Sequence, residues 1–178
     1  MLISRMWAMP NTETFDIPPI GDLVQRYLAE SRVSIDPFAR NKRWAIHTND
    51  LNPDTAAEHH LDVLDFLMCL KNKSLTADLA LFDPPYSPRQ IKECYQGISL
   101  PMSRQEAWRA QRWTQERNLL NQLIAIGGIV VSCGWNSTGM GQGRSYRIEE
   151  LLLVNHGAGH NDTIVMVERK LAHQEVLL

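Results

Sequence analysis

Short apolar runs that alternate with longer amphipathic stretches restrict the fold of this chain most. The run Leu79-Ala80-Leu81-Phe82 has no polar residue, which is typical of a strand buried on both faces of a parallel sheet. Residues 129–133 form a second predicted buried strand, and residues 151–154 and 163–167 form a predicted hairpin. Strands that alternate with helices and end in an antiparallel pair predict an open α/β sheet, mostly parallel.

The same patterns predict the remaining elements. Further strands are expected over residues 33–35 and 44–47, and helices over residues 23–31, 55–70 and 103–126. Asp54 is the expected N-cap of the second helix, and Gly127-Gly128 is expected to end the third. Between Asp50 and Asp83 there is one helical pattern and no convincing strand, so a reduced sheet edge is expected there. Residues 87–102 and 134–147 are expected to be irregular, and such segments often carry function.

Length and composition indicate one globular domain. The chain has 178 residues, 44% of them apolar and 21% charged, with a formal net charge of −2. This balance excludes a wholly basic nucleic-acid-binding coat but permits a local basic patch. Cys69, Cys94 and Cys133 are widely separated, which favours a reducing compartment over a disulfide framework or a zinc site. Residues 123–135, the longest apolar run, are too short to span a bilayer, and no signal peptide is recognisable, so a cytoplasmic domain over residues 1–178 is expected.

The most specific motif is Asp83-Pro84-Pro85-Tyr86, which directly follows the strand predicted at residues 79–82. Open α/β sheets bind their ligands at the carboxyl ends of strands. A simple turn with an Asp cap would not require the aromatic residue. Here the sequence resembles the adenine-N6 DNA methyltransferases, whose catalytic motif has this form, and in particular the small enzymes of phages and prophages. The resemblance runs from about residue 14 to 169, and the other matching pieces are residues 14–20, 35–39, 48–53 and 160–165.

The resemblance implies a Rossmann-like class I methyltransferase sheet, S-adenosylmethionine as cofactor, and Asp83, Pro84, Pro85 and Tyr86 as catalytic residues. The Asp83 carboxylate and the Pro84 carbonyl would accept the two N–H bonds of the adenine amine, whose lone pair then attacks a sulfonium methyl. The prolines stiffen this segment, so the acceptors are fixed beforehand. Tyr86 would stack on a base extruded from the duplex.

The resemblance also implies a cofactor site. Asp36 and its neighbours would lie beside the methionine part, and Asp50 would accept the ribose hydroxyls. Capping of strand ends is the alternative role for both aspartates. The segment Ala39-Arg40-Asn41-Lys42 stands where many relatives have a glycine-rich turn, which leaves open weaker cofactor binding or a different backbone path. The full set of candidate cofactor-binding residues is Phe15, Ile17, Pro19, Asp36, Pro37, Phe38, Ala39, Asp50, Leu51 and Asp83.

DNA contact would come from local charge. Residues 87–117 carry more cations than acids, with Tyr95, Trp108 and Trp113 interleaved, and are expected to form a substrate-facing insertion in the absence of a separate target-recognition domain. An amphipathic helix with its aromatic residues in the core is the alternative, and Trp113 is then the better core candidate. His156 and His160 supply only two ligands, so no metal site is expected. The candidate substrate-binding residues are Arg89, Lys92, Trp108, Arg112, Trp135, Asn136, Arg144 and His160.

The expected function is therefore S-adenosylmethionine-dependent methylation of adenine N6 in DNA, with DNA as the partner. Methylation of an RNA or of a protein amide nitrogen is one alternative, although relatives that act on glutamine generally carry Asn in place of Asp83. A non-catalytic relative that binds DNA or the cofactor is the other, and calorimetry with S-adenosylmethionine would distinguish it.

Overall fold

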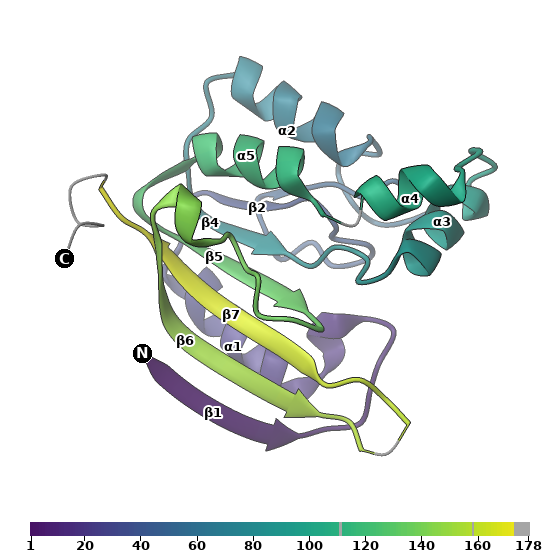
Figure 1. Cartoon of the computed structure of the whole chain (residues 1–178). Coiled ribbons are helices and arrows are strands. Elements are labelled where there is room, and N and C mark those ends of the chain that lie inside the picture. Colours follow the sequence, from purple (N-terminus) through teal and green to yellow (C-terminus); the bar gives the residue numbers. More distant parts are fainter. Residues whose placement is uncertain (111, 158, 173–178) are drawn as a thin grey trace.

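A computed structural model describes residues 1–172 apart from residues 111 and 158. They form a seven-stranded sheet of order β1-β6-β7-β5-β4-β2-β3 (Figure 1). Only β7, among the described strands, runs against its neighbours, β5 and β6. The prediction of a mostly parallel α/β sheet with an antiparallel C-terminal hairpin is confirmed. The strands are β1 (Leu2–Trp7), β2 (Ser34–Asp36), β3 (His47–Thr48), β4 (Ala77–Phe82), β5 (Ile124–Gly134), β6 (Tyr146–Asn155) and β7 (Thr163–Lys170).

Helices cover both faces of this sheet. Figure 1 shows α1 on one face and α2 and α5 on the other, with α3 and α4 packed together beside the carboxyl end of β4. Ala80 and Phe82 of β4 join one core cluster, while Leu79 and Leu81 join the other, so β4 is buried on both faces as predicted. No helix of the described residues is long and apolar enough to cross a membrane. The helices are α1 (Pro18–Glu30), α2 (Val63–Asn72), α3 (Pro88–Gly97), α4 (Arg104–Ala110) and α5 (Thr114–Leu123), with 3-10 turns at Thr14–Asp16 and Gln142–Arg144.

The two edges of the sheet differ from each other. On one side the sheet order ends at β3, which has two residues, so the expected reduction of this edge is confirmed. The predicted strand at residues 44–47 is wrong over most of its length, because β3 begins only at His47. The ring of Trp44 stacks on that of Phe15 at 5.9 Å, and the Ile46 N–H donates to the Ser34 hydroxyl rather than to a backbone carbonyl of a neighbouring strand. On the other side, β1 pairs with β6. This strand was not predicted, because nearly all of its side chains are exposed and it therefore lacks the apolar pattern of a buried strand.

The predicted helix over residues 103–126 is also wrong. α4 and α5 are separate helices, and Trp113 between them has a left-handed backbone with φ of 49°. Its ring packs in the core, 5.3 Å from Phe38, so tertiary packing overrides the continuous helical pattern. From Ile124 the chain enters β5, and Gly127-Gly128 lies inside this strand rather than at a helix end.

Other helix starts differ from the predictions as well, and α1 begins at Pro18 rather than at residue 23. α2 begins at Val63 rather than at residue 55, and Asp62 rather than Asp54 is its N-cap, accepting from the Leu64 N–H at 3.0 Å. Residues 87–102 are not irregular, because they contain α3, which begins at Ser87-Pro88: the serine caps the helix and proline occupies its first turn.

Candidate functional site

Asp83-Pro84-Pro85-Tyr86 follows β4 at the carboxyl end of the sheet. Prolines donate no backbone hydrogen bond, so the chain leaves the sheet there. The Tyr86 hydroxyl donates to Asp83 Oδ1 at 2.5 Å, and the Tyr86 N–H donates to the side chain of Gln90 on α3 at 2.9 Å. The motif is thus held at both ends, by its own side chains and by the helix that follows it.

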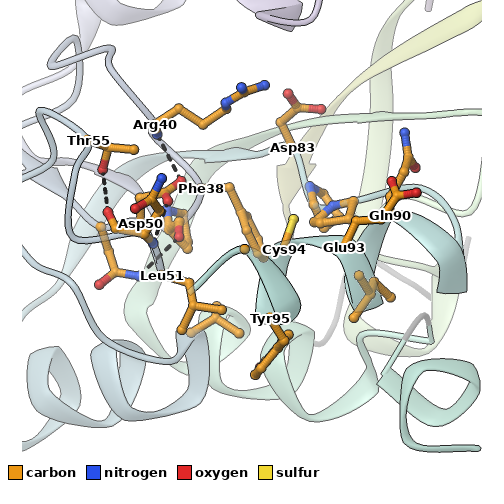
Figure 2. Close-up of a pocket in the computed structure, with 18 of the residues that line it drawn as sticks. Phe38, Arg40, Asp50, Leu51, Thr55, Asp83, Gln90, Glu93, Cys94 and Tyr95 are labelled. Carbon is orange, nitrogen blue, oxygen red and sulfur yellow. Dashed lines mark hydrogen bonds between the residues drawn. The ribbon is translucent and has the colours of Figure 1, made fainter. Parts of the chain in front are cut away.

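A cavity of about 560 Å³ opens on one side of this motif (Figure 2). Its walls come from the segments after β2 and β3, from the motif itself, and from the face of α3 that carries Gln90, Glu93 and Cys94. Thr12 and Thr14 line it from the N-terminal segment. This volume lies within the range of small-molecule and cofactor sites.

A smaller hollow of about 50 Å³ lies on the other side of the motif. Pro84, Pro85 and Tyr86 line both spaces, so the motif forms the wall between them. The ring of Trp135, from the segment after β5, lies 5.6 Å from that of Tyr86 at 66°. Arg117 and Ser132 also line the smaller hollow, and Arg117 Nε and Ser132 Oγ are buried without a hydrogen-bond partner among the described residues.

Two carboxylates of the site are electrostatically unusual. Asp36, at the end of β2, is completely buried; its Oδ1 accepts from the Phe38 N–H at 3.0 Å, and its Oδ2 has no partner in the described chain. Burial therefore raises the pKa of Asp36 well above its ordinary value. Burial also raises the pKa of Asp83, although the hydrogen bond from Tyr86 acts in the opposite direction. Both groups hold their protons more tightly than an exposed aspartate.

The turn after β2 keeps a glycine-like backbone without a glycine. Arg40 has a φ of 49°, a conformation that glycine adopts more readily than other residues. Its N–H donates to Asp50 Oδ2 at 3.2 Å, and its guanidinium donates to the Thr12 carbonyl and pairs with Glu13 at 3.2 Å. Asp50 also accepts from the Asn52 N–H at 2.9 Å while lining the cavity. Arg40 thus ties the N-terminal segment to this turn.

The structure brings only part of the candidate cofactor residues to the cavity. Asp36 and Ala39 lie buried beside it, outside its lining. Phe15 and Ile17 are buried in the core under α1, and Pro19 is partly buried in the first turn of that helix. Those that line the cavity are Pro37, Phe38, Asp50, Leu51 and Asp83.

The cofactor-binding residues predicted from the sequence did not include two parts of the cavity wall. One is formed by residues of α3, and the other by Thr12, Thr14, Arg40 and Asn41. A Ser-Pro helix start immediately after the motif was the signal that could have placed α3 across the cavity.

The candidate substrate residues fall into separate places. Trp135 and Asn136 line the smaller hollow. On α3, Arg89 is exposed and pairs with Glu93 at 2.7 Å, while Lys92 is partly buried. Beyond α3, Trp108 on α4 and Arg112 are exposed, whereas Trp113 is buried as expected for the better core candidate.

The other two candidates lie elsewhere. Arg144 donates to the Met140 carbonyl at 2.7 Å and to Asn118 Oδ1 at 2.9 Å, which fixes its own loop to α5. His160 is exposed in the connection between β6 and β7. In the same connection His156 is buried, with its two ring nitrogens 2.8 Å from the Ala8 carbonyl and 2.9 Å from Thr163 Oγ1.

No protein-family model matches the sequence, and no curated protein matches it. Solved structures do match in fold. TrmN from Thermus thermophilus is 15% identical with a TM-score of 0.55, over 87% of this chain and 49% of that one. NSun6 from Pyrococcus horikoshii, solved with the S-adenosylmethionine analogue SFG, is 13% identical with a TM-score of 0.55, over 83% and 50%.

The N-methyltransferase NodS from Bradyrhizobium japonicum, solved with S-adenosyl-L-homocysteine, is 8% identical with a TM-score of 0.55. That match covers 90% of this chain and 89% of NodS. By contrast, this chain spans about half the length of TrmN and NSun6. At these identities the likeness is one of fold, and this chain therefore has the Rossmann-like class I methyltransferase fold.

Proposed function

We propose that this protein transfers a methyl group from S-adenosylmethionine to the N6 amine of adenine in DNA. The observation that carries the proposal is the wall formed by Asp83-Pro84-Pro85-Tyr86 between a cofactor-sized cavity and a second hollow with an aromatic rim. A methyl transferase needs its donor and acceptor on two sides of one set of hydrogen-bond acceptors. The Asp at the head of the motif favours adenine as the acceptor.

The residues of the larger cavity fit S-adenosylmethionine. When bound there, this cofactor would supply an electrophilic methyl group on a sulfonium. Asp50 lies at the end of β3 on the cavity wall, where its carboxylate can accept ribose hydroxyls. Asp36 is buried beside the cavity rather than in its lining, so its unpartnered Oδ2 would have to be uncovered to accept from the ammonium of the methionine part; the cost of a buried carboxylate oxygen without a donor favours that contact. Arg40 preserves the tight turn between these two aspartates.

Asp83 and Pro84 would act on the amine. The Tyr86 hydroxyl donates to Asp83 Oδ1, and a carboxylate can accept several hydrogen bonds, so Asp83 can also accept one N–H of the amine while the Pro84 carbonyl accepts the other. Holding both N–H bonds localises the nitrogen lone pair for attack. As the nitrogen gains positive charge, the Asp83 carboxylate stabilises it, and its raised pKa suits it to take the proton that the nitrogen releases.

The second hollow would receive the edge of the target base. Its volume of about 50 Å³ is smaller than a nucleobase, so Trp135, which is 41% exposed, has to move aside when the base enters. An exposed aromatic ring beside Tyr86 is suited to stacking on a base that has left the duplex. The exposed cations Arg89 on α3 and Arg112 after α4 would contact phosphates.

Methyl transfer with defined acceptors tests the proposal. Labelled S-adenosylmethionine is incubated with single- and double-stranded DNA, and the modified nucleosides are identified by mass spectrometry. We expect N6-methyladenine from DNA, and no transfer to a matched DNA whose adenines already carry the N6-methyl group. Label in RNA or in protein, with none in DNA, would contradict the DNA assignment.

Cofactor binding can be measured separately from activity through Cys94. This thiol is exposed and lines the cavity, whereas Cys69 is partly exposed on α2 and does not line it. We expect S-adenosylhomocysteine to protect Cys94 from alkylation and to leave the Cys69 rate unchanged. Because burial raises the pKa of Cys94, the reaction is run at alkaline pH. Equal rates of Cys94 alkylation with and without the ligand would show that the cofactor does not bind in this cavity.

A further inference from the structure

β1 is an exposed apolar strand at the sheet edge remote from the candidate site. β6, β7 and β5 separate it from β4 (Figure 1). Single exposed apolar side chains are ordinary, but a row of them along a sheet edge is the arrangement that pairs with another strand. Along β1 and its flanks, side chains between 51% and 75% exposed are Met1, Leu2, Ile3, Met6, Trp7 and Met9.

The backbone of β1 has one row of groups that faces away from the sheet. The Ala8 N–H donates to the Asn155 carbonyl at 3.1 Å, so even-numbered residues of β1 face β6. Because successive residues of a strand point their N–H and C=O groups to opposite sides, those of Ile3, Arg5 and Trp7 point outward. The sheet order of the described strands ends at β1, so this row is available to another strand.

We propose that β1 pairs with the β1 strand of a second copy of this chain. The two strands run antiparallel about a two-fold axis perpendicular to the sheet, and the two sheets join into one. A closed two-fold contact of this kind uses the same surface on both copies, which is the commonest form of oligomer.

The sequence of β1 selects one register for this contact. Directly opposed residues of paired strands point to the same face, so the residue on the axis must oppose its own copy. With Ser4 on the axis, Leu2 faces Met6 of the partner subunit, and Ile3 exchanges backbone hydrogen bonds with Arg5 of the partner subunit. With Arg5 on the axis, two guanidinium groups oppose each other, which is unfavourable. The Ser4 register also lengthens the ladder relative to one centred on Ile3.

In the Ser4 register the exposed apolar side chains of Leu2, Ile3, Met6 and Trp7 lie along the contact. A contact of one short strand is smaller than the standard stable interface of about 800 Å² per partner, so the dimer is expected to form only at high protein concentration. An extended peptide of another protein could use the same edge. A second copy is favoured over such a peptide because the apolar residues Leu2 and Met6 face each other across the two-fold axis. Arg5 excludes the adjacent register.

Light scattering after size-exclusion chromatography tests the contact with matched Met→Glu variants. We expect the full chain to have about twice its 20.3 kDa mass in the high micromolar range. Met6→Glu places a charge in the contact and is expected to give a monomer. Met68→Glu, a similarly exposed methionine on α2, is expected to remain a dimer. A monomeric full chain would overturn the proposal, as would a dimer that both variants retain.

Cysteine cross-linking tests the register independently of any folding defect in Met6→Glu. In a chain whose Cys69 and Cys94 are serine, Ser4→Cys is expected to form an intermolecular disulfide on mild oxidation. Ser4 faces its own copy as a non-hydrogen-bonded pair, with Cα atoms about 4.5 Å apart, a separation that a disulfide spans. Arg5→Cys is expected not to cross-link, and the reverse result would overturn the register. Protection of Cys94 by S-adenosylhomocysteine, measured in Met6→Glu, reports on the proposed function separately.

Discussion

The ends of β4 and β6 lie at the same edge of the sheet and carry similar residue types, yet they differ in how their polar groups are satisfied. After β4, the site around the motif includes the buried Oδ2 of Asp36 at the end of β2 and the Ser132 hydroxyl of β5, both without partners among the described residues, beside Asp83, whose pKa burial raises. After β6, both nitrogens of His156 have partners, and Asn155 donates to Asp162 at 2.8 Å.

This difference separates binding machinery from structural support. A buried polar atom without a partner destabilises the protein unless a ligand satisfies it, whereas a saturated network stabilises the fold and leaves nothing for a ligand. The end of β4 has the first property and the end of β6 has the second. Substitutions at the two places should therefore change different measurements.

The largest effect is expected from Asp83→Ala. It removes the acceptor for one N–H of the amine and the partner of Tyr86, so methyl transfer should fall by at least about 10³-fold, or about 4 kcal/mol. Circular dichroism and thermal unfolding should show an intact fold, because Asp83 lines the cavity and belongs to neither core cluster. A rate within tenfold of the unmodified protein would place the chemistry elsewhere.

Asp83→Asn serves as the matched control. It keeps one acceptor oxygen and the shape of the side chain, so it should retain cofactor protection of Cys94 while losing most activity. In the unmodified protein, only the charged form of the Asp83 carboxylate accepts hydrogen bonds from both the Tyr86 hydroxyl and the N–H of the amine. Because the Asp83 pKa is raised, activity should fall on the acid side at a higher pH than for an ordinary aspartate.

His156→Ala is expected to have the next largest effect, on stability alone. It leaves the Ala8 carbonyl and Thr163 Oγ1 buried without their partner, which should lower the free energy of unfolding by about 2–3 kcal/mol. His160→Ala, four residues on and exposed, should change it by less than about 0.5 kcal/mol. Urea denaturation measures both, and reduced cofactor binding in the folded His156→Ala protein would show that the β6 end belongs to the site.

Asp36→Asn should raise the free energy of unfolding, in contrast to His156→Ala, by a smaller amount that depends on pH. The folded protein holds the Asp36 proton more tightly than the unfolded chain, so the contribution of this group is present at low pH and lost as pH rises through its folded pKa. Asparagine does not titrate. The variant should therefore gain stability relative to the unmodified protein as pH rises, measured by thermal unfolding without ligand.

With a ligand bound, aspartate rather than asparagine should be favoured at position 36. If Asp36 binds the ammonium of the cofactor, Asp36→Asn should weaken S-adenosylhomocysteine binding by about tenfold in calorimetry. Unchanged binding would leave Asp36 a structural residue like His156 and weaken the distinction between the two strand ends.

The sequence was most informative where local and global preferences agree. The apolar run of β4 and the residues after it predicted both the strand and the position of the motif, and the C-terminal hairpin followed from two alternating runs. It was least informative where tertiary contacts decide: Trp113 breaks a helical pattern because its ring is needed against Phe38. The exposed strand β1 carries no burial pattern at all.

Within the site, a residue type did not determine whether its side chain faces the cavity. The resemblance assigned Phe15 to the cofactor, yet Phe15 packs in the core, whereas its neighbour Thr14, outside that assignment, lines the cavity. The turn at residues 39–42 lacks glycine, but Arg40 adopts the glycine-like conformation. Sequence alone gives no means of knowing that a neighbouring segment supports such a strained residue.

Arg40 provides the smallest and most discriminating test of that turn. Arg40→Gly relieves the left-handed strain and loses the guanidinium contacts to Thr12 and Glu13, whereas Arg40→Ala loses the same contacts and keeps the strain. Because both variants lose the same contacts, the left-handed strain decides between them, and the glycine variant should be more stable than the alanine variant by about 1 kcal/mol in urea denaturation. The glycine variant should also bind S-adenosylhomocysteine at least as well as the alanine variant, because the path of the turn between Asp36 and Asp50 is retained. Equal stability of the two variants would mean that the backbone at Arg40 is not held in the left-handed region, and the cofactor wall would then follow a different path from the one that the end of β2 requires.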